Sequence, residues 1–292
     1  MSQKLSRKRV REILPERPVD GHKGTFGHLF VIAGSRGFTG AAKLTCRAAG
    51  RSGVGLVTLG VPHTLSDVVG AALLETMSIG LAATDQATLA RAAVAPALET
   101  AKGKQAVVLG PGISQHEETK AFVHEFVPQC TVPLLIDADG LNAIATDLDA
   151  LDRRTGPTVL TPHPGEMARL TGLTTKRIQA DRDIVALEFA ERHSCVVVLK
   201  GHGTIVANPD GEYFINETGN SGMATGGTGD ALAGLIGGLM AQGVEAFDAA
   251  LIGVFLHGLA GDIAAENMTE RAMLAGDLVE SLPDAWRVVG KR

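Results

Sequence analysis

The sequence predicts an α/β fold in which a doubly wound, mostly parallel central sheet is flanked by helices. Short runs rich in Val, Ile and Leu alternate along the chain with Ala-rich stretches of helical spacing, and each run ends in glycine or a polar turn. No Pro/Ser-rich linker and no shift in composition divides the 292 residues. We therefore expect a single domain over residues 1–292.

Six apolar runs are expected to form buried strands, because each is short, β-branched and continuous rather than alternating. They are "HLFVIAGS" (28–35), "GLVTLGVP" (55–62), "AVVLGPG" (106–112), "PLLIDADG" (133–140), "TVLTPHPGE" (158–166) and "CVVVLKG" (195–201). The pair Asp210-Gly211 lies between two further extended segments and predicts a hairpin. Helices are expected over residues 40–51, 87–101, 117–127 and 175–193, and throughout the last third, 228–286.

Composition argues against several classes of partner. The net charge is -5 with a sequence pI of 6.0, and aromatic residues make up 4% of the chain. We expect neither nucleic acid nor a membrane as a partner, since electrostatic attraction and stacking platforms are lacking. The basic start, "KLSRKRVRE", is expected to be a solvated helix face rather than a nucleic-acid arm.

Cysteine spacing and apolar segments bear on the compartment. Cys46, Cys130 and Cys195 show no C-x-x-C spacing, so neither a disulfide framework nor a zinc site is expected. The charged N-terminus does not resemble a secretion signal, and the longest apolar stretches, 231–241 and 249–260, fall short of the ~20 residues of a membrane span. We expect a cytoplasmic protein.

The stretch "GMATGGTGDALAG" carries the strongest chemical signal. Its glycines leave the N–H groups of a helix start uncovered, which predicts an anion hole at Gly226, Gly227, Thr228 and Gly229. Asp230 at the opening of this helix is placed to take a proton from a hydroxyl that attacks a phosphate. The alternative is that Asp230 only caps the helix.

Other strand ends supply weaker signals, because ligands of such sheets bind outside the carboxyl ends of the strands. His163 is held between two prolines and suits ligand orientation, or is structural. Lys200 and Thr204 in "LKGHGT" suit a phosphate, or form only a turn. The side chains of "DADGLN", Asp137, Asp139 and Asn142, suit Mg²⁺-bound water or form an Asx-type turn.

These motifs, in this order over about residues 10–285, resemble the ADP-dependent NAD(P)H-hydrate dehydratases of the ribokinase-like superfamily; "GMATGGTGD" together with "TPHPGE" is the specific part. The resemblance implies a ribokinase-like fold and the reaction ADP + (6S)-NAD(P)H hydrate → AMP + phosphate + NAD(P)H. The ring hydroxyl is phosphorylated and phosphate then leaves. The resemblance also implies Mg²⁺, ADP as phosphoryl donor and a homotetramer. It does not identify the metal ligands.

The resemblance also implies site residues. Ala41, Gly112, His163 and Asp230 would contact the hydrated dinucleotide, with Asp230 catalytic; the adenine nucleotide would bind to Lys200, Gly201, His202, Gly203, Thr204 and Gly229. Ser221 stands where the family usually has proline, so we expect a less rigid loop there. About 20 residues precede the first motif, which predicts a stand-alone dehydratase without an N-terminal epimerase domain.

Three other functions compete. A kinase for a hydroxymethylpyrimidine or hydroxyethylthiazole alcohol would share "GTGD" but not "HKGTFGH" or "TPHPGE". A nucleotide-binding regulator would not need an intact Asp230. An NAD-dependent oxidoreductase is disfavoured because "GSRGFTG" does not match G-x-G-x-x-G. The choice of ADP over ATP, and of NADH hydrate over NADPH hydrate, stays open.

Overall fold

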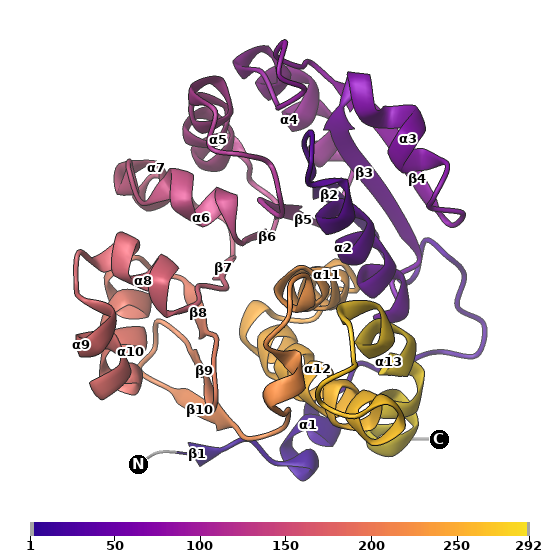
Figure 1. The fold of residues 1–292 in the computed structure, drawn as a ribbon, viewed down its shortest axis with the longest axis vertical. Coiled ribbons are helices and arrows are strands. Elements are labelled where there is room, and N and C mark those ends of the chain that lie inside the picture. Colours follow the sequence, from indigo (N-terminus) through magenta and orange to yellow (C-terminus); the bar gives the residue numbers. More distant parts are fainter. Residues whose placement is uncertain (1–2, 291–292) are drawn as a thin grey trace.

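One ten-stranded sheet organises the chain in the computed structural model, which describes residues 3–290 (Figure 1). The strand order is β1-β10-β9-β8-β7-β6-β5-β2-β3-β4, and every neighbouring pair is parallel except β8/β9 and β9/β10. The strands are β1 Gln3–Lys4, β2 His28–Ile32, β3 Leu56–Pro62, β4 Thr76–Leu81, β5 Ala106–Leu109, β6 Leu134–Ile136, β7 Thr158–Leu160, β8 Val196–Leu199, β9 Thr204–Ala207 and β10 Tyr213–Asn216. The predicted mostly parallel sheet is confirmed.

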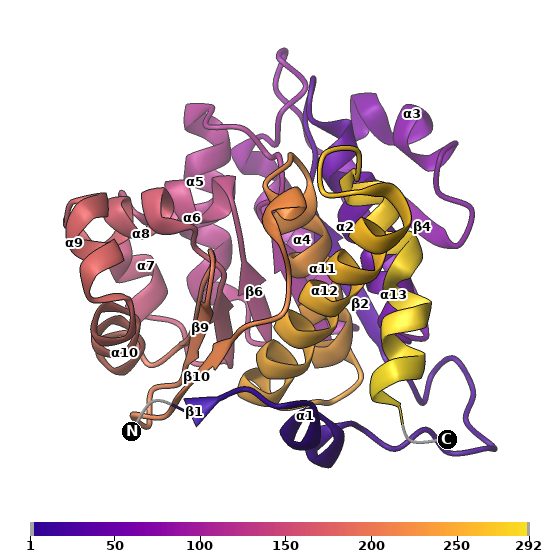
Figure 2. The same cartoon turned by 60° about the horizontal axis from the view of Figure 1, so that its bottom comes forward.

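Helices cover both faces of the sheet. Helices α1, α2, α11, α12 and α13 share one buried cluster on one face, whereas α4, α5, α6, α8 and α10 share a second cluster on the other (Figure 2). The α-helices are α1 Arg7–Ile13, α2 Thr39–Arg51, α3 Ser66–Gly70, α4 Val94–Lys102, α5 Glu117–Gln129, α6 Asp139–Ile144, α7 Leu148–Asp152, α8 Pro164–Thr171, α9 Thr175–Ala180, α10 Arg182–Arg192, α11 Thr228–Ala241, α12 Ala246–Met268 and α13 Ala275–Val289. Short 3₁₀ turns are η1 His63–Leu65, η2 Arg91–Ala93 and η3 Ser221–Met223.

Glycines bring α11 into direct contact with α2. A Cβ at Gly234 would lie 2.0 Å from the carbonyl oxygen of Thr45, and one at Gly238 would lie 2.1 Å from Ser52 Oγ. No side chain fits at either position without displacing α2. Glycine destabilises a helix, but at these two positions it allows α11 to pack closely on α2. This packing fixes the direction of α11.

Two predicted helices differ from the observed ones. The stretch 87–101 begins as a turn, because Ala83 bridges Leu89 and the amide of Ala87, at φ +54°, donates to Thr84; helix α4 starts only at Val94. The stretch 175–193 is broken at Asp181, whose φ of -135° ends α9 and starts α10. The sequence reasoning also missed strands β1 and β4 at the two edges of the sheet.

Other expectations hold. The hairpin at Asp210-Gly211 joins antiparallel β9 and β10. In α1 the charged side chains face solvent while Val10 is fully buried, so the basic start is a solvated helix face as predicted. Cys46, Cys130 and Cys195 are free and buried.

The expectation that no segment reaches the length of a membrane span needs correction. Helix α12 has 23 residues and a mean hydropathy of 1.4 over its most apolar window, which meets that test by length and composition. In the structure 67% of this window is buried against the rest of the chain. Its apolar character therefore serves the core between α11 and α13.

Candidate active site

The site lies where the strand order reverses, at the carboxyl ends of β2 and β5. From β2 the chain builds outward through β3 and β4, and then returns to β5 on the other side of β2. Such a switch point opens a crevice above the sheet. The loop after β5 presents Gly112 at φ +63°, where a Cβ would come within 3.0 Å of the Cβ of Ala41 on α2. The structure thus brings Ala41 and Gly112 together.

The start of α11 borders this crevice and carries bare amides. Its N-cap is Gly227, at φ +96°, and no side chain caps it. The first helical hydrogen bond runs from Ala231 N–H to the Gly227 carbonyl at 3.1 Å, so the amides of Thr228, Gly229 and Asp230 have no acceptor among residues 3–290. Free amides at the positive end of a helix dipole favour an anion.

Asp230 occupies the first turn of α11 but does not cap it. Its carboxylate has no hydrogen-bond partner among the described residues, which leaves the predicted anion hole uncapped. Burial raises the pKa of Asp230 from 3.8 to about 7, and the negative charge of Asp137 adds to the rise while Lys200 opposes it. A carboxylate with a pKa near the working pH suits a general base.

A half-buried cation lies beside Asp230. Lys200 Nζ lies 2.8 Å from Asp137 Oδ1 and 3.7 Å from Glu166 Oε2, and a Cβ at Gly229 would come within 3.4 Å of it. Burial lowers the pKa of Lys200, but Asp137 and Glu166 outweigh this effect and the net pKa is raised. Lys200 therefore stays charged at the start of α11, where its own partners are carboxylates.

Asp137 is the most deeply buried member of this group, with 1% of its surface exposed. The hydroxyl of Thr161 donates to its Oδ1 at 2.7 Å. By contrast, Asp139 accepts from the amide of Ser114 at 2.9 Å, and Asn142 accepts from Arg169 at 2.9 Å. Of the three "DADGLN" side chains, Asp137 faces Lys200, Asp139 holds the loop after β5 and Asn142 binds helix α8, without forming the Asx-type turn considered above.

His163 is the N-cap of α8. Its Nδ1 accepts from the amides of Gly165 (2.9 Å) and Glu166 (3.3 Å), while Glu166 accepts from the amide of His163 at 2.7 Å. The ring is half exposed, with Nε2 3.4 Å from Glu166 Oε1. His163 therefore has a structural role as the cap of α8, and a ligand can reach the half of its ring that is exposed.

Glu166 was missed by the sequence reasoning. It is 5% exposed and joins the His163 cap to the ammonium of Lys200. A Glu three residues after an N-cap is the signature of a capping box. This spacing is the sequence signal that could have identified Glu166.

The loop Lys200–Thr204 connects β8 to β9 beside this cluster. Gly201 (φ +140°) and Gly203 (φ +65°) adopt conformations that favour glycine, and His202 is exposed. The hydroxyl proton of Thr204 is used inside the loop, where it donates to the Gly201 carbonyl at 2.9 Å. Lys200 is the first residue of this loop, and its ammonium lies beside the start of α11, where a Cβ at Gly229 would be 3.4 Å from it.

His257 on α12 binds the first residue of α11 by a hydrogen bond, and it was not identified from sequence. Its Nε2 lies 2.8 Å from the carbonyl oxygen of Thr228. Burial lowers the pKa of His257 to about 4, so the neutral ring donates this hydrogen bond at neutral pH.

Hydrogen bonds hold the loop at Ser221, the position at which the family usually has proline. The hydroxyl of Ser221 donates to Glu270, and Asn220 both donates to Asp262 at 3.0 Å and accepts from the amide of Gly222 at 2.9 Å. The loop ahead of the glycine-rich segment is therefore tethered to α12 and to the segment that follows it.

Gly226 offers a test of the anion hole. A Cβ there would meet nothing within 4 Å, so we expect Gly226→Ala to keep the stability of the parent or to gain about 0.4–1 kcal/mol. The added methyl group would enter the open space next to the segment whose amides are bare, where a bound anion would meet it, and we expect calorimetric titration with ADP to show affinity at least about tenfold weaker, or 1.4 kcal/mol. Gly103→Ala, at an equally open glycine that follows α4, is the control. Equal ADP affinity in both variants would contradict the assignment.

Comparison with known proteins agrees with this geometry. The profile of the NAD(P)H-hydrate dehydratase family matches residues 29–284. A bifunctional NAD(P)H-hydrate repair enzyme from Moorella thermoacetica is 46% identical over 277 residues, 95% of this chain and 52% of that protein. The chain thus spans about half the length of this relative.

Solved structures give the fold. The ADP/ATP-dependent NAD(P)H-hydrate dehydratase from Bacillus subtilis, co-crystallised with ATP/Mg²⁺, superposes with a TM-score of 0.84 at 31% identity and 99% coverage of both chains. A ribokinase-like superfamily protein from Enterococcus faecalis has a TM-score of 0.85 at 27% identity, with 100% of this chain and 97% of that chain covered. The ribokinase-like fold is confirmed, and the chain belongs to the NAD(P)H-hydrate dehydratase family.

Proposed function

We propose that this chain dehydrates (6S)-NAD(P)H hydrate to NAD(P)H at the expense of ADP, with release of AMP and phosphate, and is thus a carbon–oxygen lyase. The observation that carries the proposal is Asp230, a carboxylate with a pKa near 7 beside three helix amides, all without a hydrogen-bond partner within residues 3–290. A base next to an anion site fits the phosphorylation of a hydroxyl group.

The residues divide the work between proton transfer and charge. As the oxygen of the ring hydroxyl bonds to the terminal phosphorus of the nucleotide, Asp230 accepts the hydroxyl proton and AMP leaves. The amides of Thr228, Gly229 and Asp230 hold the phosphoryl oxygens. The ring C–O bond then breaks, phosphate departs, and loss of a ring proton restores the double bond. Protein positioning and charge supply most of the catalysis in such transfers.

The residues present fit magnesium only as a companion of the nucleotide. Residues 3–290 contain no group of three or more His, Cys, Asp or Glu side chains arranged to hold a metal ion. Mg²⁺ is often bound by one or two carboxylates together with substrate phosphates. Asp137 and Glu166 are the carboxylates at the anion hole that would hold it. When bound, the ion would neutralise charge on the phosphates.

Ala41, Gly112 and His163 would receive the hydrated dinucleotide. Gly112 and Ala41 pack together beside Phe38, whose side chain is exposed, and His163 presents a half-exposed ring joined through Glu166 to the Lys200 cluster. The loop Lys200–Thr204 would receive the adenine nucleotide, since it adjoins the anion hole at Gly229.

His163 is predicted to orient substrate without moving a proton. His163→Gln, which keeps a side-chain donor, is expected to retain more turnover than His163→Ala. His163→Asn separates the capping role, because asparagine caps helices well and alanine costs about 1 kcal/mol of stability. Thermal melting and kcat/KM for the hydrate are measured on all three. Complete loss of turnover in both Gln and Ala variants, with an Asn variant that melts like the parent, would indicate acid–base work by the ring.

The direct test mixes the protein with hydrated NADH or NADPH, Mg²⁺ and either ADP or ATP, and follows recovery of the long-wavelength dihydronicotinamide absorbance. We expect recovery together with release of phosphate. Absence of recovery with both nucleotides and both hydrates would remove the proposal. Phosphorylation of an alcohol without regain of absorbance would favour a kinase of the same fold.

We further propose a homo-oligomer, a tetramer in the form that the family resemblance implies, in the cytoplasm. The buried, free thiols of the three cysteines suit a reducing compartment. Helix α11 is buried within its own chain and is not available for a contact between subunits. In the described part of the last third, the exposed large apolar side chains for such a contact are Met268, Leu274 and Val288. Light scattering after size-exclusion chromatography measures the mass, and a monomer would contradict the oligomer.

A further inference from the structure

Arg182, at the start of α10, is a half-buried cation that no carboxylate neutralises among residues 3–290. Its Nη2 donates to the carbonyl oxygens of Leu199 (2.9 Å), Lys200 (3.3 Å) and Gly203 (3.4 Å), and its Nη1 donates to Gln179. Its Nε is buried and finds no partner among the described residues. Burial lowers the pKa of Arg182, which remains charged as arginines do. The guanidinium therefore lies directly against the β8–β9 loop with its charge uncompensated.

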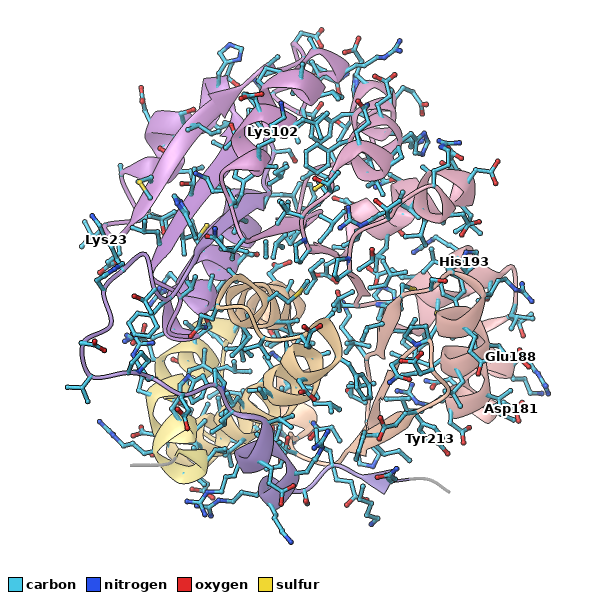
Figure 3. All side chains as sticks on the ribbon, turned by 180° about the vertical axis from the view of Figure 1, so that it is seen from behind. Lys23, Lys102, Asp181, Glu188, His193 and Tyr213 are labelled. Atoms are coloured by element: carbon cyan, nitrogen blue, oxygen red, sulfur yellow. The ribbon has the colours of Figure 1, made fainter. Side chains whose placement is uncertain are left out.

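Packing of α10 on the hairpin puts Arg182 there. Helix α10 contacts β8 and β9, and the hydroxyl of Tyr213 on β10 donates to Asp183 at 3.0 Å. Figure 3 labels Asp181, the residue before Arg182, at the same edge of the molecule as Tyr213. The start of α10 is thus fixed to the strands that the loop joins.

The contacts of Arg182 join the two ends of the β8–β9 loop. The guanidinium binds the carbonyl of Lys200 at the start of the loop and that of Gly203 at its end, which holds the turn between them in one conformation. The amides of Gly201, His202 and Gly203 have no acceptor among residues 3–290. Successive free amides in a glycine-rich turn form a concave anion site.

We infer that Arg182 is a positioning residue for the phosphates of the adenine nucleotide: by binding the carbonyls of Lys200 and Gly203 at the two ends of the loop, it holds the turn whose free amides, those of Gly201, His202 and Gly203, receive the anion. This inference rests on the proposed function for the identity of the anion. Arg182 touches neither Asp230 nor the residues Ala41 and Gly112, so it acts on the nucleotide and not on the hydrate or the proton transfer.

The chain offers a matched control. Arg154 is also a half-buried arginine whose guanidinium donates to backbone carbonyls, those of Cys130, Val132 and Pro157, and its pKa is likewise lowered by burial. It lies at the amino ends of β6 and β7, the end of the sheet opposite the site. Arg154→Lys therefore measures what a carbonyl-binding arginine contributes to stability alone.

The test compares Arg182→Lys with Arg154→Lys in the full chain. Lysine keeps the charge but cannot span three carbonyls. We expect Arg182→Lys to weaken ADP binding in calorimetric titration by about tenfold or more, and to raise KM for ADP equally, while KM for the hydrate and kcat at saturating ADP stay within about threefold. Arg154→Lys should leave both KM values unchanged even where it lowers Tm by as much.

A second readout separates positioning from folding. In Arg182→Ala, added guanidinium ion at non-denaturing concentration should restore part of the ADP affinity, and it should do nothing for the parent. ADP affinity within threefold of the parent in Arg182→Lys, or an equal rise of both KM values in both lysine variants, would overturn the inference. Calorimetry needs no turnover, so failure of the proposed reaction in the parent would not be mistaken for failure of this inference.

Discussion

Replacement of Asp230 by asparagine is expected to lower kcat for phosphate release by about 10²–10⁴-fold, which corresponds to a barrier about 3–5 kcal/mol higher. In the part of the chain that the structure describes, the carboxylate has no hydrogen-bond partner to lose, and the asparagine keeps its size. Only the base is removed. ADP titration of the same variant should show affinity within a few fold of the parent, because the amides of Thr228 and Gly229 remain.

The pH dependence follows from the same group. Asp230 must be ionised to accept a proton, so kcat/KM of the parent should rise with pH and level off above about pH 7, where the carboxylate is deprotonated. Stability should run the other way. Because folding raises the pKa of this acid from 3.8 to about 7, its contribution is fully present below about pH 4 and is lost as pH rises to 7. The asparagine variant lacks this loss and should melt no lower than the parent at pH 8.

Asp248→Asn is the matched control for Asp230. Asp248 holds the same first-turn position on α12, and burial raises its pKa too, but its partner is Arg9 on α1 at 3.6 Å, away from the crevice. Turnover within a factor of two of the parent is expected. If Asp230→Asn itself turned over within a few fold of the parent, another base would be required, first Asp137 or Asp139, both of which have hydrogen-bond partners.

The strand ends and the motifs on them were predictable from sequence because both are local. Each buried strand is a short apolar run, and parallel strands bring their carboxyl ends to one edge. That argument alone places Gly112, His163, Lys200 and Asp230 near each other. Strand β4 escaped it because it lies at the sheet edge and "TMSIGL" is largely exposed.

The supporting residues were not predictable for a physical reason. His257 contacts Thr228 across 29 positions of sequence, and Arg182 reaches loop carbonyls 17 to 21 positions away. Neither residue is part of a motif, because each acts on the site through hydrogen bonds to backbone carbonyl groups. Burial of Asp137 and Glu166 against Lys200 likewise depends on how three strands align. The sequence placed Lys200 at a nucleotide, whereas its nearest partners are carboxylates; contact with phosphate stays a prediction.

Replacement of Lys200 by methionine is expected to lower the free energy of unfolding at pH 7 by about 3–5 kcal/mol, the cost of leaving a buried charge without its partner. Asp137 is 1% exposed, so its carboxylate depends on the ammonium as its charge partner. Activity should fall as well. Lys200 lowers the pKa of Asp230, and its removal should shift the rise of kcat/KM to a pH above 7.

Lys120→Met supplies the comparison that isolates burial. Lys120 is about as exposed as Lys200, 26% against 19%, and its ion pair is equally short at 2.8 Å, but its partner Glu117 is 86% exposed. Exposed pairs contribute about 0–1 kcal/mol, so this variant should unfold nearly as the parent does. The double variant Lys200→Met/Asp137→Asn should recover part of the lost stability, because the stranded charge is gone. Denaturant unfolding measures all four proteins. A loss in Lys200→Met no larger than in Lys120→Met, with an unchanged pH–rate profile, would mean that the ammonium neither stabilises the carboxylate cluster nor sets the charge of the base.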